Sequence, residues 1–184
     1  MPSVSPILAP AASRGRSART AAGDPADAPG IETWRTFLVA HARITRRLDD
    51  ELQAAHGLSL AEYDALLQVA TAPGRRIRMN VLAERVILSR SGITRLVDRL
   101  EAQGCLARSA CATDARGQEA VLTTVGLERL RAAATTHLEG VHRYFLDRLD
   151  GAELAALETS LGRVAGPLSP SDHPAHEGCT PDEA

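Results

Sequence analysis

Asp114, Arg116 and Gly117 form an Asp-x-Arg-Gly sequence within the stretch CATDARGQEAVLT, residues 111–123. A guanidinium group binds phosphate oxygens well, and a neighbouring carboxylate can orient it through an ion pair. Two short apolar runs, CLARSA and EAVLT, flank the sequence, and a glycine between such runs is typical of a hairpin turn. We therefore expect a two-stranded hairpin with a charged tip and Gly117 in the turn. An ion pair that only stabilises this turn is the alternative.

A second set of polar residues lies on the segment SRSGITRLVDRLEAQG, residues 89–104. If the segment is a helix, with about 100° between successive residues, its apolar side chains share one face. The opposite, outward face carries small, hydroxyl-bearing or cationic side chains. Such a face fits a DNA major groove, where hydroxyls reach phosphates or base edges and arginine binds guanine bidentately. An ordinary solvated face fits this pattern equally well. The apolar face holds Ile93, Leu96, Val97 and Leu100, and the candidate contacts are Ser89, Arg90, Ser91, Thr94, Arg95 and Arg99.

The distribution of charge favours the DNA-binding interpretation. The chain has a net charge of −2 over 184 residues, which by itself suggests no nucleic-acid partner. Between Arg75 and Arg116, however, nine arginines and four acidic residues leave a local excess of five positive charges. A basic window that coincides with a helix and a hairpin is the expected electrostatic signature of a DNA-binding protein.

Several helices are expected to position these residues. Ser59 and Glu62 form a capping box at the start of one helix, Pro73-Gly74 ends it, and Gly57 ends the helix before it. The expected order is helix, helix, helix, helix, hairpin, long helix, helix, which is the winged helix-turn-helix arrangement flanked by long helices. The helical segments are 31–56, 59–72, 80–87, 89–104, a run of apolar residues from 127 to 149, and a last helix capped by Asp150 and Glu153.

The segment from Leu82 to Gly126 resembles the MarR (multiple antibiotic resistance regulator) family of bacterial transcription factors. The matching features are Leu82-Ala83-Glu84, the run TRLVDRLE at 94–101, Gly104, Asp114-x-Arg116-Gly117 and Leu122-Thr123-x-x-Gly126. The resemblance implies a protein that is mainly α with a small β-hairpin wing, and that acts as a homodimer. It also implies that two recognition helices enter successive major grooves of a pseudo-palindromic operator.

The resemblance also assigns roles within the wing. Arg116 would enter the minor groove, where narrow DNA concentrates negative potential. Asp114 would orient Arg116 or pair with another arginine, for which Arg99 is our candidate. We expect residues 1–30 to be a disordered leader, 31–166 the folded domain and 167–184 a disordered tail. Within the domain, residues 59–123 would form the DNA-binding lobe, and 31–56 and 124–166 the dimerisation helices.

Family members often bind small anionic or aromatic molecules between the DNA-binding lobe and the dimerisation helices. The candidates for such an effector pocket are Trp34, His41, Arg47 and Tyr63, although packing or exposure to solvent explains each of them more simply. The resulting prediction is a cytoplasmic, sequence-specific regulator, acting as a repressor that a small ligand relieves. We expect no cofactor, no metal, no membrane segment and no enzymatic activity, because catalytic and phosphate-loop patterns are absent.

Two alternatives remain open from the sequence. The first is a sensor of the same fold that responds to thiol oxidation or metal. Cys105 has the setting of a buried core thiol, Cys111 lies nearer the wing, and His173, His176 and Cys179 supply only three possible ligands. The second is a winged helix used only for contact with other proteins.

Overall fold

The computed structural model describes residues 28–86, 88–111 and 114–166. The chain divides into two compact units, Met1–Leu38 and Val39–Ala184, and each is described by itself. The expected disordered leader and tail lie outside the described residues, apart from positions 28–30 and 166. In the first unit, Trp34 and Phe37 stack on the same helix face with ring centroids 5.9 Å apart. Both rings are largely exposed.

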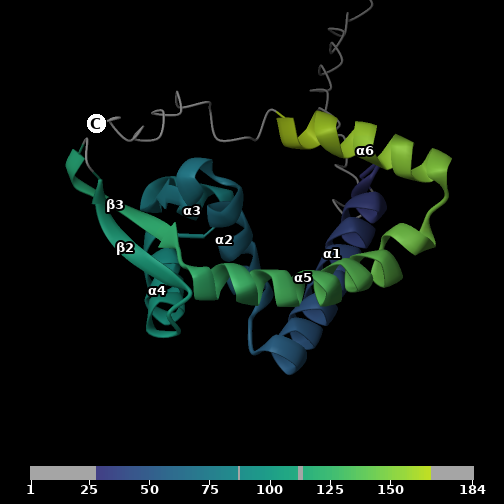
Figure 1. The fold of residues 1–184 in the computed structure, drawn as a ribbon. Coiled ribbons are helices and arrows are strands. Elements are labelled where there is room, and N and C mark those ends of the chain that lie inside the picture. Colours follow the sequence, from purple (N-terminus) through teal and green to yellow (C-terminus); the bar gives the residue numbers. More distant parts are fainter. Residues whose placement is uncertain (1–27, 87, 112–113, 167–184) are drawn as a thin grey trace, which may run out of the picture. The chain divides into compact units, whose positions relative to one another are not determined.

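The element order agrees with the expected helices and wing (Figure 1). The helices are α1 (Ile31–His56), α2 (Leu60–Thr71), α3 (Met79–Arg85), α4 (Arg90–Ala102), α5 (Thr124–Tyr144) and α6 (Gly151–Ala165), with short 3-10 helices η2 (Pro73–Arg75) and η3 (Leu146–Arg148). The strands are β1 (Arg76–Arg78), β2 (Leu106–Cys111) and β3 (Asp114–Leu122). Among the described residues, no helix is both long and apolar enough to cross a membrane.

The helix boundaries follow the capping residues identified from the sequence. At the start of α2, Ser59 Oγ accepts the Glu62 N–H at 3.2 Å and Glu62 Oε2 accepts the Ser59 N–H at 3.0 Å. Asp150 and Glu153 form the same box on α6. Gly57 and Gly104 follow α1 and α4 with φ values of 60° and 69°, in the left-handed region that favours glycine. These predictions are confirmed.

One helix prediction agrees within two residues and another was wrong at its end. The third helix was expected around 80–87, and α3 runs from Met79 to Arg85, with Ile87 outside the described residues. The long helix was expected to include Phe145 and Leu149, but α5 ends at Tyr144 and Phe145 has non-helical φ/ψ of −133° and −66°. The apolar spacing continues past Tyr144 because Phe145 and Leu149, which flank η3, keep the helical interval, so periodicity alone did not locate the break.

The wing contains a strand that was not predicted. The three strands form an antiparallel sheet in the order β1-β3-β2. The ladder between β2 and β3 is regular from Leu106↔Leu122 to Ala110↔Gln118, and then shifts so that Cys111 pairs with Asp114. Gly117 therefore lies inside β3, within this irregularity, and the prediction that it forms the turn was wrong. The irregularity is the kind of bulge that bends a strand locally.

The core of the second unit lies between the helices α2 to α5 and the sheet. The apolar faces of α2 and α4 meet there, and Ile77, Ala120 and Leu122 contribute from the strands. The predicted buried face of α4 is confirmed, since all four of its apolar residues are at most 2% exposed. The largest fully buried side chains are Leu52, Leu58, Leu66, Val69, Leu82, Ile93, Leu96, Val97, Leu100, Cys105 and Leu106.

The part of α1 that follows Val39 packs on α5. His56 Nε2 lies 2.8 Å from Thr136 Oγ1, so a hydrogen bond joins the two helices. A Cβ atom at Gly140 would lie 2.5 Å from Leu48 Cδ2, which means that the helices approach too closely there for a larger residue. The dimerisation helices expected from the resemblance are thus in contact within the chain.

Gly126 allows α5 to begin directly against the first residues of the wing. Thr123 caps α5 by accepting the Gly126 N–H at 3.0 Å, and its hydroxyl donates to the Cys105 carbonyl at 3.0 Å. A Cβ atom at Gly126 would overlap the Cys105 carbonyl oxygen and lie 2.9 Å from Leu122 Cδ1. The last glycine of the Leu-Thr-x-x-Gly sequence therefore has a steric role.

Gly126→Ala should lower the free energy of unfolding by about 1–3 kcal/mol, because the new methyl group meets backbone that has to move. The matched control is Gly151→Ala on α6, where a Cβ atom meets nothing within 4 Å. This control should change stability by no more than about 0.5 kcal/mol. Urea unfolding at a fixed protein concentration measures both, and equal stabilities of the two variants would contradict the steric role.

Candidate nucleic-acid interface

The outward face of α4 is exposed as the sequence predicted. Ser89 caps the helix, with its Oγ accepting the Gly92 N–H at 3.1 Å. Five of the six candidate contacts have exposed side chains, and the buried apolar face holds the helix against the core beneath them. The exposed five are Ser89, Ser91, Thr94, Arg95 and Arg99, and the Arg90 side chain lies outside the described residues.

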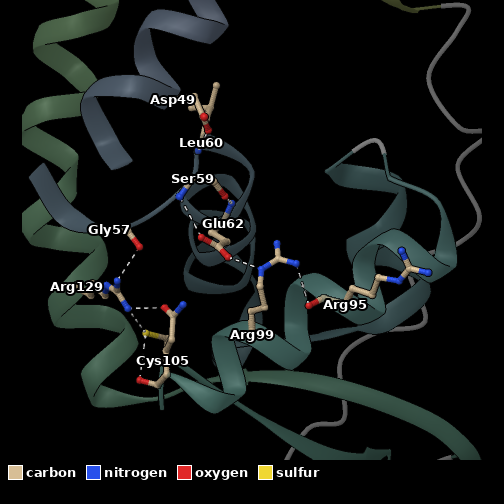
Figure 2. A network of polar contacts seen from close by, with 10 residues as sticks. Asp49, Gly57, Ser59, Leu60, Glu62, Arg95, Arg99, Cys105 and Arg129 are labelled. Carbon is tan, nitrogen blue, oxygen red and sulfur yellow. Dashed lines mark hydrogen bonds and ion pairs between the residues drawn. The ribbon is translucent and has the colours of Figure 1, made fainter. Parts of the chain in front are cut away.

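Arg99 is engaged by a buried carboxylate. Its Nε–H donates to Glu62 Oε1 at 2.9 Å, and its Nη1–H donates to the Arg95 carbonyl at 3.3 Å. Burial opposes ionisation of Glu62, yet hydrogen bonds from the Ser59 backbone and from Arg99 hold its pKa below the usual 4.5. Figure 2 shows the Arg95 side chain extending away from this network. Of the two arginines, Arg95 is therefore the one directed away from Glu62.

Arg108 on β2 connects the wing to α4. Its guanidinium donates to Asp98 Oδ1 at 2.5 Å and to Glu101 Oε2 at 2.7 Å, and its backbone N–H donates to Glu101 Oε1 at 3.3 Å. We call these three residues the Arg108 cluster. The cluster was not predicted from the sequence, although two acids three residues apart on one helix face were a usable signal. The cluster fixes the base of the wing against the recognition helix.

Residues 112–113, between β2 and β3, lie outside the described residues, and the residues beside them are described only in their backbone. Asp114 and Arg116 belong to β3, and the register shift leaves the positions between Asp114 and Gln118 without counterparts in β2. The side chains of residues 111–116 lie outside the described residues. The pairing of Asp114 with Arg99 therefore stays a prediction, and the Arg99 guanidinium already has Glu62 as an ion-pair partner.

The local charge is smaller than the sequence window suggested. Folding brings Glu62 and Glu119, both outside the window, against Arg99 and Arg76 at 2.9 and 3.6 Å. Counting these two acids reduces the local excess of positive charge from five to three. The window along the chain omits these two acids because they approach it only in the fold.

The effector-pocket candidates have different surroundings. Tyr63 is 5% exposed and packs on His137, with ring centroids 4.4 Å apart. His41 and Arg47 are exposed on α1, and Trp34 belongs to the first unit. Burial raises the pKa of Tyr63 and lowers that of His137. Tyr63 is therefore part of the packing between α2 and α5.

The cysteine and metal alternatives depend largely on residues outside the described part of the chain. Cys105 is fully buried, as predicted. Among the described residues, no group of three His, Cys, Asp or Glu side chains could hold a metal ion. His173, His176 and Cys179 lie outside the described residues, as does the side chain of Cys111.

Arg129 joins the DNA-binding lobe to the end of α1. Its Nη2 donates to the carbonyls of His56 and Gly57, both at 3.0 Å, and its Nη1 donates to Gln103 Oε1 at 2.5 Å. Figure 2 shows the bond between Arg129 and the Gly57 carbonyl. The first two bonds satisfy carbonyls that a helix end leaves without partners. One residue of α5 thereby fixes the turn after α1 and the turn after α4.

A recognition helix held by a core, a β-hairpin packed at its end and an exposed basic face define a winged helix-turn-helix DNA-binding protein. Residues 56–117 match the model of the MarR family. The chain is 35% identical to Sco3205, a MarR family transcriptional regulator from Streptomyces coelicolor whose crystal structure is in complex with DNA. That match covers 77% of this chain and 89% of Sco3205, with a TM-score of 0.73.

The chain therefore belongs to the MarR family and is a DNA-binding transcriptional regulator; the family is not one of enzymes. AbsC, another MarR family regulator from S. coelicolor, is 34% identical over 75% of this chain and 93% of its own, with a TM-score of 0.71. An HTH-type transcriptional regulator of Bacillus cereus is 28% identical over 127 residues, covering 69% of this chain and 83% of that protein.

Arg108→Met should lower the free energy of unfolding by about 1–2 kcal/mol, since it leaves two carboxylates without their shared partner. Arg95→Met is the matched control, because it removes an exposed guanidinium from the neighbouring helix face. It should change stability by no more than about 0.5 kcal/mol. Urea unfolding compares them, and an Arg108→Met variant as stable as the control would mean that the cluster contributes nothing.

Acidification should destabilise the protein through His137. Burial lowers its pKa below the usual 6.5, so the unfolded chain binds more protons than the folded chain just below that pH. The free energy of unfolding should therefore fall as the pH drops through this region, and it should fall less in His137→Gln. Parallel slopes in the wild type and His137→Gln would refute the assignment.

Proposed function

We propose that this regulator is a homodimeric repressor that binds a pseudo-palindromic operator with α4 and the wing, and that a small ligand relieves repression. The observation that carries the DNA-binding part is the exposed outward face of α4, whose opposite face is fixed in the core. A helix held in this way can enter a major groove without losing its own packing.

The proposed contacts divide between two grooves. Arg95 reaches base edges in the major groove, while Ser89, Ser91 and Thr94 reach phosphates or base edges near it. Arg90 and Arg99 are the remaining candidates on α4. At the wing, Arg116 enters the minor groove, Asp114 orients an arginine, and Gly117 lies in the irregular part of β3, which aims the tip.

Exposed apolar residues support the homodimer. None of the residues of α6 is buried, although the helix carries an apolar stripe. Large apolar side chains are also exposed on α1 and α5, and such residues on long helices mark surfaces for association. They are Trp34, Phe37, Leu38, Val39, Val125, Leu138, Leu161 and Val164.

The direction of regulation and the ligand rest on the family resemblance. The proposed effector is a small anionic or aromatic molecule, and binding would change the spacing of the two recognition helices. Of the four candidate residues, His41 and Arg47 are accessible on α1, whereas Tyr63 is accessible only if α2 and α5 separate. The protein would act in the cytoplasm, where the DNA is.

DNA binding should be sequence-dependent and steeply salt-dependent, because arginines displace counterions from phosphates. A gel-shift titration against the DNA upstream of the protein's own gene, at several salt concentrations, tests this, and light scattering gives the mass of the free protein. Arg116→Ala should weaken binding at least about tenfold at unchanged dimer mass, and Arg95→Ala should relax the base preference.

Arg131→Ala, at an exposed position of α5, is the control and should bind as the wild type does. Undiminished affinity of Arg116→Ala would mean that the wing is only structural. Absence of any salt-dependent affinity would favour a winged helix used only for protein contact. Loss of binding after peroxide treatment would instead favour a thiol-based sensor.

A further inference from the structure

Glu62 is a buried carboxylate that the proposed DNA contacts do not use. It is 5% exposed, and both of its oxygens are occupied. Oε2 accepts the Ser59 N–H at 3.0 Å, within the capping box of α2, and Oε1 accepts the Arg99 Nε–H at 2.9 Å. A buried carboxylate needs such partners to remain charged. The same side chain thus starts α2 and binds the recognition helix.

Arg99 transmits this contact to the part of α4 that faces DNA. Its side chain is 55% exposed, but its guanidinium turns back across α4 and donates to the Arg95 carbonyl at 3.3 Å. Arg95 is an exposed cation on the outward face, and Figure 2 shows it directed away from Glu62. The ion pair therefore acts at the turn of α4 that presents Arg95.

The same network continues to two further helices. Leu60 N–H donates to Asp49 Oδ1 at 2.7 Å, which connects the first residue of α2 to α1. Arg129 of α5 binds the carbonyl of Gly57 at 3.0 Å, in the turn between α1 and α2. The start of α2 is thereby held by α1 and α5 on one side and holds α4 on the other.

We propose that Glu62 is a positioning residue for DNA recognition: its ion pair with Arg99 fixes the rotation of α4 about its axis at which Arg95 meets base edges. Arg99 then acts through Glu62 and Arg95 and makes no phosphate contact of its own. The proposal rests on the proposed use of α4 and Arg95 in base recognition. It makes the start of α2 the connection between the long helices and the recognition helix.

If Glu62 only sequestered Arg99, its effect on DNA affinity would have the opposite sign. If Arg99 were a phosphate contact restrained by Glu62, removing the charge of Glu62 would release a cation to DNA. Affinity would rise, and the dependence of affinity on salt would steepen by about 0.9 for each additional phosphate that is neutralised. A positioning role predicts weaker specific binding and an unchanged salt dependence, so the two roles differ in sign.

The experiment compares Glu62→Gln, Arg99→Gln and the double variant, as full chains, with the wild type. The probe is the duplex that the wild-type protein enriches from a randomised DNA pool, and a shuffled duplex of equal length measures non-specific binding. Each single variant should lose about tenfold in the ratio of specific to non-specific affinity, with the loss at the positions that Arg95 contacts. The double variant should lose no more than either single variant, because both remove one interaction.

Glu153→Gln is the matched control. Glu153 occupies the same position in the capping box of α6, and no arginine pairs with it among the described residues. It should therefore keep the wild-type base preference. Melting curves confirm that each variant is folded, and Arg99→Gln reports on the pair if Glu62→Gln does not fold, because Arg99 is half-exposed.

Three results would overturn the proposal. Higher affinity of Glu62→Gln with a steeper salt dependence would make Arg99 a phosphate contact. An unchanged affinity ratio in a folded Arg99→Gln would make the pair purely structural. Additive losses in the double variant would mean that the two residues act separately. Failure of the proposed function is distinct from all three, since the wild type would then enrich no duplex.

Discussion

The structure depends on the burial of one face of α4. Ile93, Leu96, Val97 and Leu100 enter the core with the apolar residues of α2 and the sheet, and the opposite face of the same helix, which we propose binds DNA, stays exposed. A helix of 13 residues has few neighbours that can restrain it without covering that face. Apolar contacts hold its position and oppose large rotations about its axis, which would expose these residues, but they fix its exact orientation less well because they are not directional.

Ionic contacts at the two edges of α4 are directional and fix the rotation of the helix about its axis. Glu62 binds Arg99 from the α2 side, and Arg108 binds Asp98 and Glu101 from the wing. Each ion pair lies at the border between core and solvent, where a charged group can be paired without the full penalty of burial. The recognition helix is thus fixed by apolar contacts beneath and by paired charges on both flanks.

Much of this arrangement was predictable from local sequence. The caps at Ser59, Ser89 and Asp150, the glycines that end α1 and α4, and the buried face of α4 all depend on residues within one or two turns of each other. The pairing of Glu62 with Arg99 was not predictable, because 37 positions separate the two residues. Strand β1 was missed since three residues, two of them arginine, give no usable alternation.

The candidate contacts were predictable to a similar extent. The exposed positions of α4 followed from its helical period, whereas the role expected for Gly117 was wrong because β3 already begins at Asp114. The bulge in β3 and the acids that pair with Arg76 and Arg99 produce no local pattern in the sequence. Each depends on which strand or helix packs against the residue in the fold.

The irregular register of the wing has a consequence for how such regulators diverge. Regular pairing stops at Ala110↔Gln118, and the positions between Asp114 and Gln118 have no counterparts on β2. Changes of length or sequence at the tip therefore leave the ladder below undisturbed. A lineage could therefore vary this tip at little cost in folding, and if the wing contacts DNA as proposed, target choice is free to drift while the scaffold stays the same.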